Sequence, residues 1–223
     1  MSRTVIFDLD GTLADTSADL IAAANHCFAA RGHGTPLDPQ ADAATAFRGG
    51  RAMLRLGLTR LGLPWTERDV DADYPVLLAA YGDAIDVHTT LYPGAVAAVE
   101  RLRARGDKVG ICTNKPEGLA ETLMQRLGVR DMFAALIGAD TLPVRKPDPA
   151  PLRETVARVG GDMARATLIG DTVTDRDTAR AAGIPCVLVT FGPTGRAVAE
   201  LQPEALLDHY DLLEHQLERI IPL

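Results

Sequence analysis

Residues 4–16 read TVIFDLDGTLADT, and this stretch determines how the rest of the chain is interpreted. Its first four residues are β-branched or aromatic, which is typical of a buried strand. The run then ends in Asp8-Leu9-Asp10, so two carboxylates at positions i and i+2 project to the same side. Such a pair repels unless a divalent cation, an anionic substrate or a shared proton belongs to the site. The alternative is an ordinary acidic turn at the protein surface.

The composition is that of a globular protein with one large domain, or with a core and a smaller insertion. The chain has 223 residues, of which 47% are hydrophobic. A net charge of -7 argues against nucleic acid or an anionic membrane as the main partner. The three cysteines are widely spaced and form no CxxC pair, which suits a reducing compartment and offers neither a disulfide framework nor a zinc site. No signal peptide or membrane span is expected, so we expect a cytoplasmic protein. We expect it to be a monomer or a homodimer.

Two patterns divide the chain. Residues 16–85 show apolar positions at helical spacing and contain no strand candidate. From residue 86 onward, strands and helices alternate, and the tail from 196 to 223 is expected to form short helices. Strands are expected at 108–112, 135–138, 166–170 and 185–190. The alternation predicts an α/β fold, a doubly wound parallel sheet formed by residues 1–15 and 86–223, with residues 16–85 as an inserted helical domain.

Polar side chains follow three of the expected strands, at the edge where open α/β sheets bind ligands. Taken alone, each of them could be a helix cap or an exposed loop residue. The chain has three lysines, however, and two of them, Lys115 and Lys146, fall at this edge. Together these residues indicate one site, whose members are Asp8, Asp10, Thr113, Asn114, Lys146, Asp171 and Asp175.

The order of these motifs resembles that of the haloacid dehalogenase-like hydrolase superfamily: DxDGT, Thr-Asn, Lys-Pro and GDxxxD. The resemblance spans the whole chain, and the helical block lies where that superfamily places an α-helical cap. The stretches DLDGTLADTSADL, CTNKP, RKPDPAPL and GDTVTDRDTARAAGIP more narrowly resemble the phosphoglycolate phosphatase branch. Hydrolases of sugar phosphates, pyrophosphate and other small phosphates share many of these motif residues.

The resemblance implies Mg²⁺-dependent hydrolysis of a small organic phosphomonoester, with 2-phosphoglycolate favoured as the substrate. Asp8 would be the nucleophile that forms an aspartyl-phosphate, and Asp10 would move protons. The same resemblance places Mg²⁺ between the Asp8 carboxylate, the Asp10 backbone carbonyl and Asp171. Asp175 would support the metal shell through waters or lysine rather than bind the ion directly. The phosphoryl oxygens would be held by Thr113, the Asn114 backbone amide and the positive charge of Lys146.

Arg48 and Arg51 flank two glycines in the helical block. An arginine there could bind a substrate carboxylate bidentately, and Arg51 is the first candidate because it follows a helix start. Arg48 is the second candidate. The alternative for both is a solvated arginine on a helix surface.

The same residues bear on other functions found in the superfamily. The dehalogenase branch lacks the second acid, so Asp8 with Asp10 favours phosphate chemistry. Phosphonoacetaldehyde hydrolases use a lysine of the cap, whereas residues 15–87 contain no lysine. A phosphosugar mutase of the β-phosphoglucomutase type remains an alternative, as does a phosphatase for pyrophosphate or a sugar phosphate. A regulatory protein on an inactive scaffold is disfavoured, because every motif position holds a chemically competent residue.

Overall fold

The computed structural model describes residues 2–222, which form two compact units. The helical unit is Thr16–Thr90, and the α/β unit comprises the residues up to Asp15 and those from Leu91 onward. The predicted boundary after residue 85 lies slightly before the observed division. The returning segment stays with the helices because the Asp19 carboxylate accepts hydrogen bonds from the backbone N–H groups of His88 and Thr89 at 2.8–3.0 Å.

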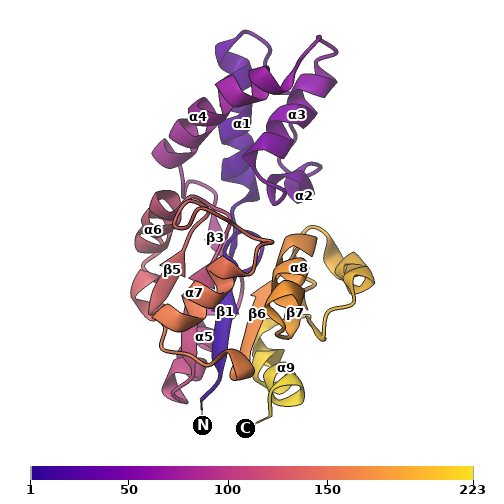
Figure 1. Ribbon diagram of the computed structural model, residues 1–223. Helices are drawn as coiled ribbons and strands as arrows, with labels where there is room; N and C mark the ends of the chain where they lie inside the picture. The colour runs from indigo at the N-terminus through magenta and orange to yellow at the C-terminus, as the bar shows by residue number, and fades with distance from the viewer. Residues whose placement is uncertain (1, 223) are drawn as a thin grey trace. The chain divides into compact units, whose positions relative to one another are not determined.

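The α/β unit is built on six parallel strands in the order β5-β4-β1-β6-β7-β8 (Figure 1). Their bounds are β1 Thr4–Phe7, β4 Lys108–Cys112, β5 Ala135–Ile137, β6 Ala166–Gly170, β7 Cys186–Val189 and β8 Ala205–Leu207. β1 is fully buried, and Phe7 lies opposite Ile111 of β4 and Ile169 of β6. The residues that follow β1, β4 and β6 therefore meet at one edge of the sheet, as the sequence predicts. A separate two-stranded sheet pairs β2 (Ala14–Asp15) with β3 (Thr90–Leu91).

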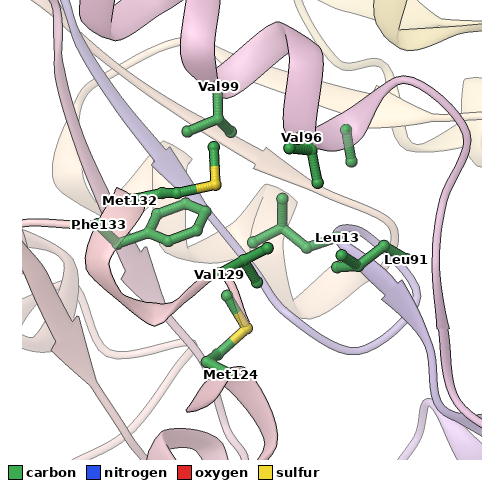
Figure 2. A pocket seen from close by; sticks show the side chains of 9 residues that line it. Leu13, Leu91, Val96, Val99, Met124, Val129, Met132 and Phe133 are labelled. Atoms are coloured by element: carbon green, nitrogen blue, oxygen red, sulfur yellow. The ribbon is translucent and has the colours of Figure 1, made fainter. Parts of the chain in front are cut away.

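Helices cover both faces of the six-stranded sheet. On one face, Ile6 joins an apolar cluster with residues of α7 (Ala150–Arg158) and α8 (Val173–Ala182). The next residue, Phe7, points to the other face and packs edge-on against Phe133. Figure 2 shows Phe133 and Val99 of α5 (Ala95–Ala104) among the residues that line an apolar cavity. The remaining helices of this unit are α6 (Glu117–Arg126), which contacts β5, and α9 (Leu213–Ile220), which contacts α5 and β8.

The prediction for the C-terminal tail is partly wrong. Residues from 196 onward were expected to form only helices, but Ala205–Leu207 form strand β8 between two 3₁₀-helices, Gly195–Leu201 and Tyr210–Leu212. The backbone of this segment is held at the sheet edge, where Glu204 N–H donates to Cys186 O and Thr190 N–H donates to Leu207 O, both at 3.0 Å. Three apolar residues carry no periodicity that distinguishes strand from helix, so only pairing with β7 determines this element.

The helical unit contains α1 (Ser17–Ala30), α2 (Ala43–Ala46), α3 (Gly50–Arg60) and α4 (Glu67–Asp83). Within residues 17–89, which the structure describes throughout, these helices are the only regular elements, as the sequence predicts. α1 and α3 approach closely at Gly57, where an added Cβ would lie 2.3 Å from the Phe28 ring. Among residues 2–222, no helix has the length and apolar character needed to cross a bilayer.

Candidate active site

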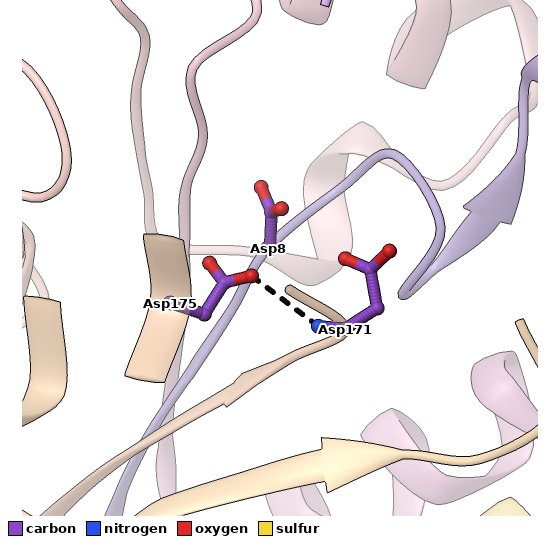
Figure 3. A group of neighbouring side chains, drawn as sticks. All are labelled: Asp8, Asp171 and Asp175. Carbon is purple, nitrogen blue, oxygen red and sulfur yellow. Dashed lines mark hydrogen bonds between the residues drawn. The ribbon is translucent and has the colours of Figure 1, made fainter. Parts of the chain in front are cut away.

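The sheet edge brings together residues that lie far apart in the sequence. Asp8 directly follows β1, and its backbone N–H donates to Ile169 O of β6 at 2.8 Å. Thr113 follows β4, and its N–H donates to Ile137 O of β5 at 2.9 Å. Asp171 follows β6, and Figure 3 shows its side chain beside those of Asp8 and Asp175. The strand hydrogen bonds therefore continue into the site and fix the backbone from which its side chains project.

Lys146 lies between two of these carboxylates. Its Nζ is 3.0 Å from Asp8 Oδ1 and 2.7 Å from Asp175 Oδ1, and its side chain is 1% exposed. The contact with Asp175 is a hydrogen bond, whereas Asp8 Oδ1 has no partner of hydrogen-bond geometry. We therefore interpret the Lys146–Asp8 contact as electrostatic. Burial disfavours the charged ammonium, but Asp175 and Asp8 outweigh it and raise the pKa of Lys146, so this group stays positive.

Two carboxyl groups at the site hold protons more tightly than usual. Burial raises the pKa of Asp8 to about 6; Lys146 opposes this shift, while Asp175 adds to it. Burial, followed by the charges of Asp175 and Asp8, raises the pKa of Asp171 well above its ordinary value. One lysine thus leaves the negative charge of the cluster only partly balanced, and the site favours additional positive charge.

Asp175 differs from its neighbours because protein donors occupy both of its oxygens. Oδ1 accepts from Lys146, and Oδ2 accepts from the Thr172 N–H at 3.1 Å and the Thr172 hydroxyl at 2.9 Å, completing a capping box at the start of α8. An added Cβ at Gly170 would lie 2.3 Å from the Asp175 Cγ, so the glycine permits this close approach. The arrangement fixes Asp175 as the carboxylate that holds Lys146 in place.

The acidic cluster suits a hard divalent cation. Oxygens of Asp8, Asp171 and Asp175 lie within 4.8 Å of one another. Carboxylate oxygens are the ligands that such cations prefer. The buried Asp8 Oδ1 without a hydrogen-bond partner and the raised pKa values of Asp8 and Asp171 fit a group of carboxylates that can hold a cation. Asp8 and Asp171 are better placed than Asp175 to act as ligands, because Asp175 is engaged by Lys146 and Thr172.

Asp10 has a partner whose role the sequence analysis did not identify. Lys115 Nζ lies 3.0 Å from Asp10 Oδ1, and the Lys115 side chain is 3% exposed. The Asp10 backbone forms a bridge to Ala14, and Gly11 turns the chain with a φ of 80°. Asp8 and Asp10 thus each pair with a different buried lysine. Two features of the sequence pointed to Lys115: lysine is scarce in this chain, and Lys115 directly follows Thr113-Asn114.

Thr113 and Asn114 are placed differently. The Thr113 side chain is buried, and its hydroxyl accepts from the Lys115 N–H at 3.2 Å. The Asn114 side chain donates to the backbone carbonyl of Lys146 at 2.9 Å, so it anchors the loop that carries the lysine. A further residue missed by sequence reasoning is Thr12, which is fully buried and whose hydroxyl donates to Asp171 Oδ1 at 3.3 Å. Its position within DLDGT is the only local signal for that role.

The two arginine candidates belong to the helical unit. Arg51, in the first turn of α3, pairs with Asp71 at 2.6 Å, and its guanidinium lies 4.8 Å from the centre of the Tyr74 ring. Arg48 precedes α3 and is exposed. Gly49 between them has a φ of 95°, which favours glycine at the position where the chain enters the helix.

Comparison with known proteins defines the class of this protein. A family model described as haloacid dehalogenase-like hydrolase matches residues 5–189. A Mesorhizobium japonicum protein named phosphoglycolate phosphatase is 42% identical over 223 residues, covering 99% of this chain and 98% of that protein. A Rhodospirillum rubrum protein of the same name is 38% identical over 217 residues, covering 94% of this chain and 88% of that protein. The chain belongs to the haloacid dehalogenase-like hydrolase family.

Solved structures show the same fold. The crystal structure of a predicted phosphoglycolate phosphatase from Haemophilus somnus 129PT has a TM-score of 0.84 and 22% identity, covering 96% of this chain and 97% of that one. A hydrolase from Pseudomonas syringae has a TM-score of 0.75 and 24% identity, covering 98% and 99%. Both the resemblance read from the motifs and the predicted α/β fold are thereby confirmed.

Proposed function

We propose that this chain is a Mg²⁺-dependent phosphatase that hydrolyses 2-phosphoglycolate, a small organic phosphomonoester. The observation that carries the proposal is the buried Asp8 carboxylate at the end of the central strand, 3.0 Å from the Lys146 ammonium and beside Asp171. A phosphomonoester dianion resists an anionic nucleophile, so catalysis requires positive charge at the point of attack. The names of the relatives support the choice of substrate.

The proposed Mg²⁺ ligands are the carboxylates of Asp8 and Asp171 and the backbone carbonyl of Asp10. Mg²⁺ binds oxygen ligands and retains several waters, and when bound it would offset negative charge on the transferring phosphoryl group. Asp175 would not bind the ion directly, because its oxygens already accept hydrogen bonds from Lys146 and from the start of α8.

The two half-reactions follow from the proposed roles. Asp8 attacks phosphorus in line with the leaving oxygen, and the bond between phosphorus and that oxygen breaks as the aspartyl-phosphate forms. Asp10 donates a proton to the departing alkoxide. Asp10 then takes a proton from the water that attacks the aspartyl-phosphate, which releases phosphate and restores Asp8. The phosphoryl oxygens are stabilised throughout by Lys146, the Thr113 hydroxyl and the Asn114 backbone N–H.

The helical unit is the proposed cap, which excludes water during transfer and contributes to the choice of leaving group. Within it, Arg51 is the first candidate to bind the substrate carboxylate, and Arg48 is the second. The Arg51–Asp71 pair is partly exposed, with side-chain exposures of 38% and 61%. Pairs of this kind contribute about 0–1 kcal/mol, so a substrate carboxylate can replace Asp71 as the partner.

The substrate is tested by measuring phosphate release from a panel of phosphorylated metabolites with Mg²⁺ present and with a chelator. We expect 2-phosphoglycolate to have the highest kcat/KM and the chelator to abolish turnover. A higher kcat/KM for a sugar phosphate or pyrophosphate would reject the substrate assignment. Activity that requires a bisphosphate activator, with an aspartyl-phosphate protected from water, would indicate the mutase instead.

Replacing Asp10 tests its role as the proton donor. Asp10→Asn is expected to lower kcat for 2-phosphoglycolate by roughly 10²–10⁴-fold, because the alkoxide then leaves without a proton. Turnover of p-nitrophenyl phosphate should fall less, since p-nitrophenolate leaves without protonation. Steady-state kinetics on both esters provides the comparison. Equal losses would contradict the acid role and leave only a role common to both esters, such as taking a proton from the attacking water.

Replacing Arg51 tests recognition of the substrate carboxylate. Arg51→Ala is expected to raise KM for 2-phosphoglycolate by roughly 10–100-fold, the range expected for the loss of a hydrogen bond to a charged group. The KM for p-nitrophenyl phosphate, which has no carboxylate, should change little and serves as the control. If KM for 2-phosphoglycolate does not move, Arg51 does not bind the carboxylate, and Arg48→Ala becomes the variant to measure.

A further inference from the structure

Tyr92 occupies a fixed position beside the candidate active site without being part of any motif. It directly follows β3, and its backbone N–H donates to Leu13 O at 3.0 Å, which ties it to the turn after Asp10. Its ring lies 4.8 Å from that of Phe191, and Phe191 in turn lies 5.4 Å from Tyr210. The direction of the Tyr92 hydroxyl is therefore set by packing within the α/β unit.

The hydroxyl of Tyr92 is buried and has no hydrogen-bond partner among the described residues. Leaving a buried polar group unpaired is destabilising, so the hydroxyl without a partner requires an explanation. The hydroxyl of Tyr210, by contrast, is paired in the usual way, because it donates to Thr12 O at 2.7 Å. Of these two tyrosines, only Tyr92 has a hydroxyl without a hydrogen-bond partner.

The surroundings of the hydroxyl indicate what it can bind. The charges that act on it, after burial, come from Asp15, Asp171 and Asp10, and all of them raise the pKa of Tyr92. A tyrosine in that setting remains a hydrogen-bond donor. None of these carboxylates is within hydrogen-bonding reach of it, so its acceptor is a group that the described residues do not supply.

We propose that the Tyr92 hydroxyl donates a hydrogen bond to a water of the Mg²⁺ ion held by Asp8, Asp10 and Asp171. This inference rests on the proposed function, because it assumes that Mg²⁺ binds at that site. Three protein ligands and one phosphoryl oxygen do not complete an octahedron, and waters fill the remaining positions. A donor fixed beside such a water orients it and stabilises the bound ion, which makes Tyr92 a positioning residue.

The test is Tyr92→Phe in the full chain, which removes the hydroxyl and keeps the ring that packs on Phe191. Isothermal titration calorimetry with Mg²⁺ alone, without substrate, is expected to show a Kd raised by about tenfold. Thermal unfolding of the metal-free variant should occur at the wild-type temperature or above it, because the lost group had no partner.

Tyr210→Phe is the matched control, because it removes a paired hydroxyl from the same aromatic group. It is expected to lower the unfolding temperature of the metal-free protein, and to change the Mg²⁺ affinity less than Tyr92→Phe does. An unchanged Mg²⁺ Kd in Tyr92→Phe, or a loss of metal-free stability like that of Tyr210→Phe, would overturn the inference. Failure of the wild-type protein to bind Mg²⁺ would instead reject the metal in the proposed function.

Discussion

Asp8→Asn is expected to abolish turnover of every phosphomonoester while the protein remains folded. The amide has nearly the same shape as the carboxylate but cannot attack phosphorus, so no aspartyl-phosphate forms. Loss of a catalytic nucleophile lowers turnover by roughly 10⁴-fold or more. Phosphate release from 2-phosphoglycolate and from p-nitrophenyl phosphate measures the effect, and both esters should be affected alike, since each requires the nucleophile.

The same substitution is expected to stabilise the metal-free protein at neutral pH. Burial raises the pKa of Asp8 from 3.8 to about 6, so the folded state holds this proton more tightly than the unfolded state does. The resulting stabilisation is complete below pH 3.8 and is lost as the pH rises through about 6. Asparagine is neutral at every pH, so the variant should unfold at a higher temperature than wild type at pH 7, with the difference shrinking toward pH 4.

Asp162→Asn provides the matched control for these measurements. Asp162 is exposed, and its Oδ1 accepts from the Ala164 N–H at 2.9 Å at the opposite end of the sheet, before β6. This substitution should leave both turnover and the pH dependence of unfolding close to wild type. Turnover of Asp8→Asn within about tenfold of wild type would contradict the nucleophilic role.

The fold and the sheet edge that carries the site could be predicted from local sequence patterns, because the carboxyl ends of parallel strands lie at the same edge of a sheet. The strands at 4–7, 108–112 and 166–170 are short β-rich runs, and their carboxyl ends share an edge in any right-handed doubly wound sheet. Asp8, Thr113 and Asp171 therefore lie side by side once the strand order is known. The strand order places β1 between β4 and β6, and that places Asp8 at the centre.

Partnerships between side chains could not be predicted in this way. Lys115 pairs with Asp10, Thr12 with Asp171, and the Asn114 side chain with the Lys146 carbonyl. Each pair depends on how two loops pack, and no periodicity or capping rule links positions so far apart in the sequence. The unmatched hydroxyl of Tyr92 belongs to the same category. The β8 strand was missed for a related reason, because its edge position depends on hydrogen bonds to β7.

Lys146→Met is expected to impair both catalysis and folding, because one ammonium group serves two buried carboxylates. Methionine keeps an unbranched chain of similar length but removes the charge beside Asp8 Oδ1 and Asp175 Oδ1. The loss of this stabilising charge should lower kcat by roughly 10³-fold. Breaking a buried ion pair by removing one partner costs about 3–5 kcal/mol, so the free energy of unfolding should fall by about that amount.

Lys108, one of the other two lysines of the chain, provides the control. Lys108→Met replaces an exposed lysine at the start of β4 and should change stability by less than about 0.5 kcal/mol. Without Lys146, the largest effect that lowers the pKa of Asp8 is lost, so that carboxyl takes a proton more readily and relieves its own unpaired charge. Denaturant unfolding at a series of pH values should therefore show the Lys146→Met deficit largest near neutral pH and smaller in acid. A deficit that does not vary with pH would mean that Lys146 contributes by packing alone, and equal stability of the Lys146→Met and Lys108→Met variants would contradict the central role assigned to this lysine.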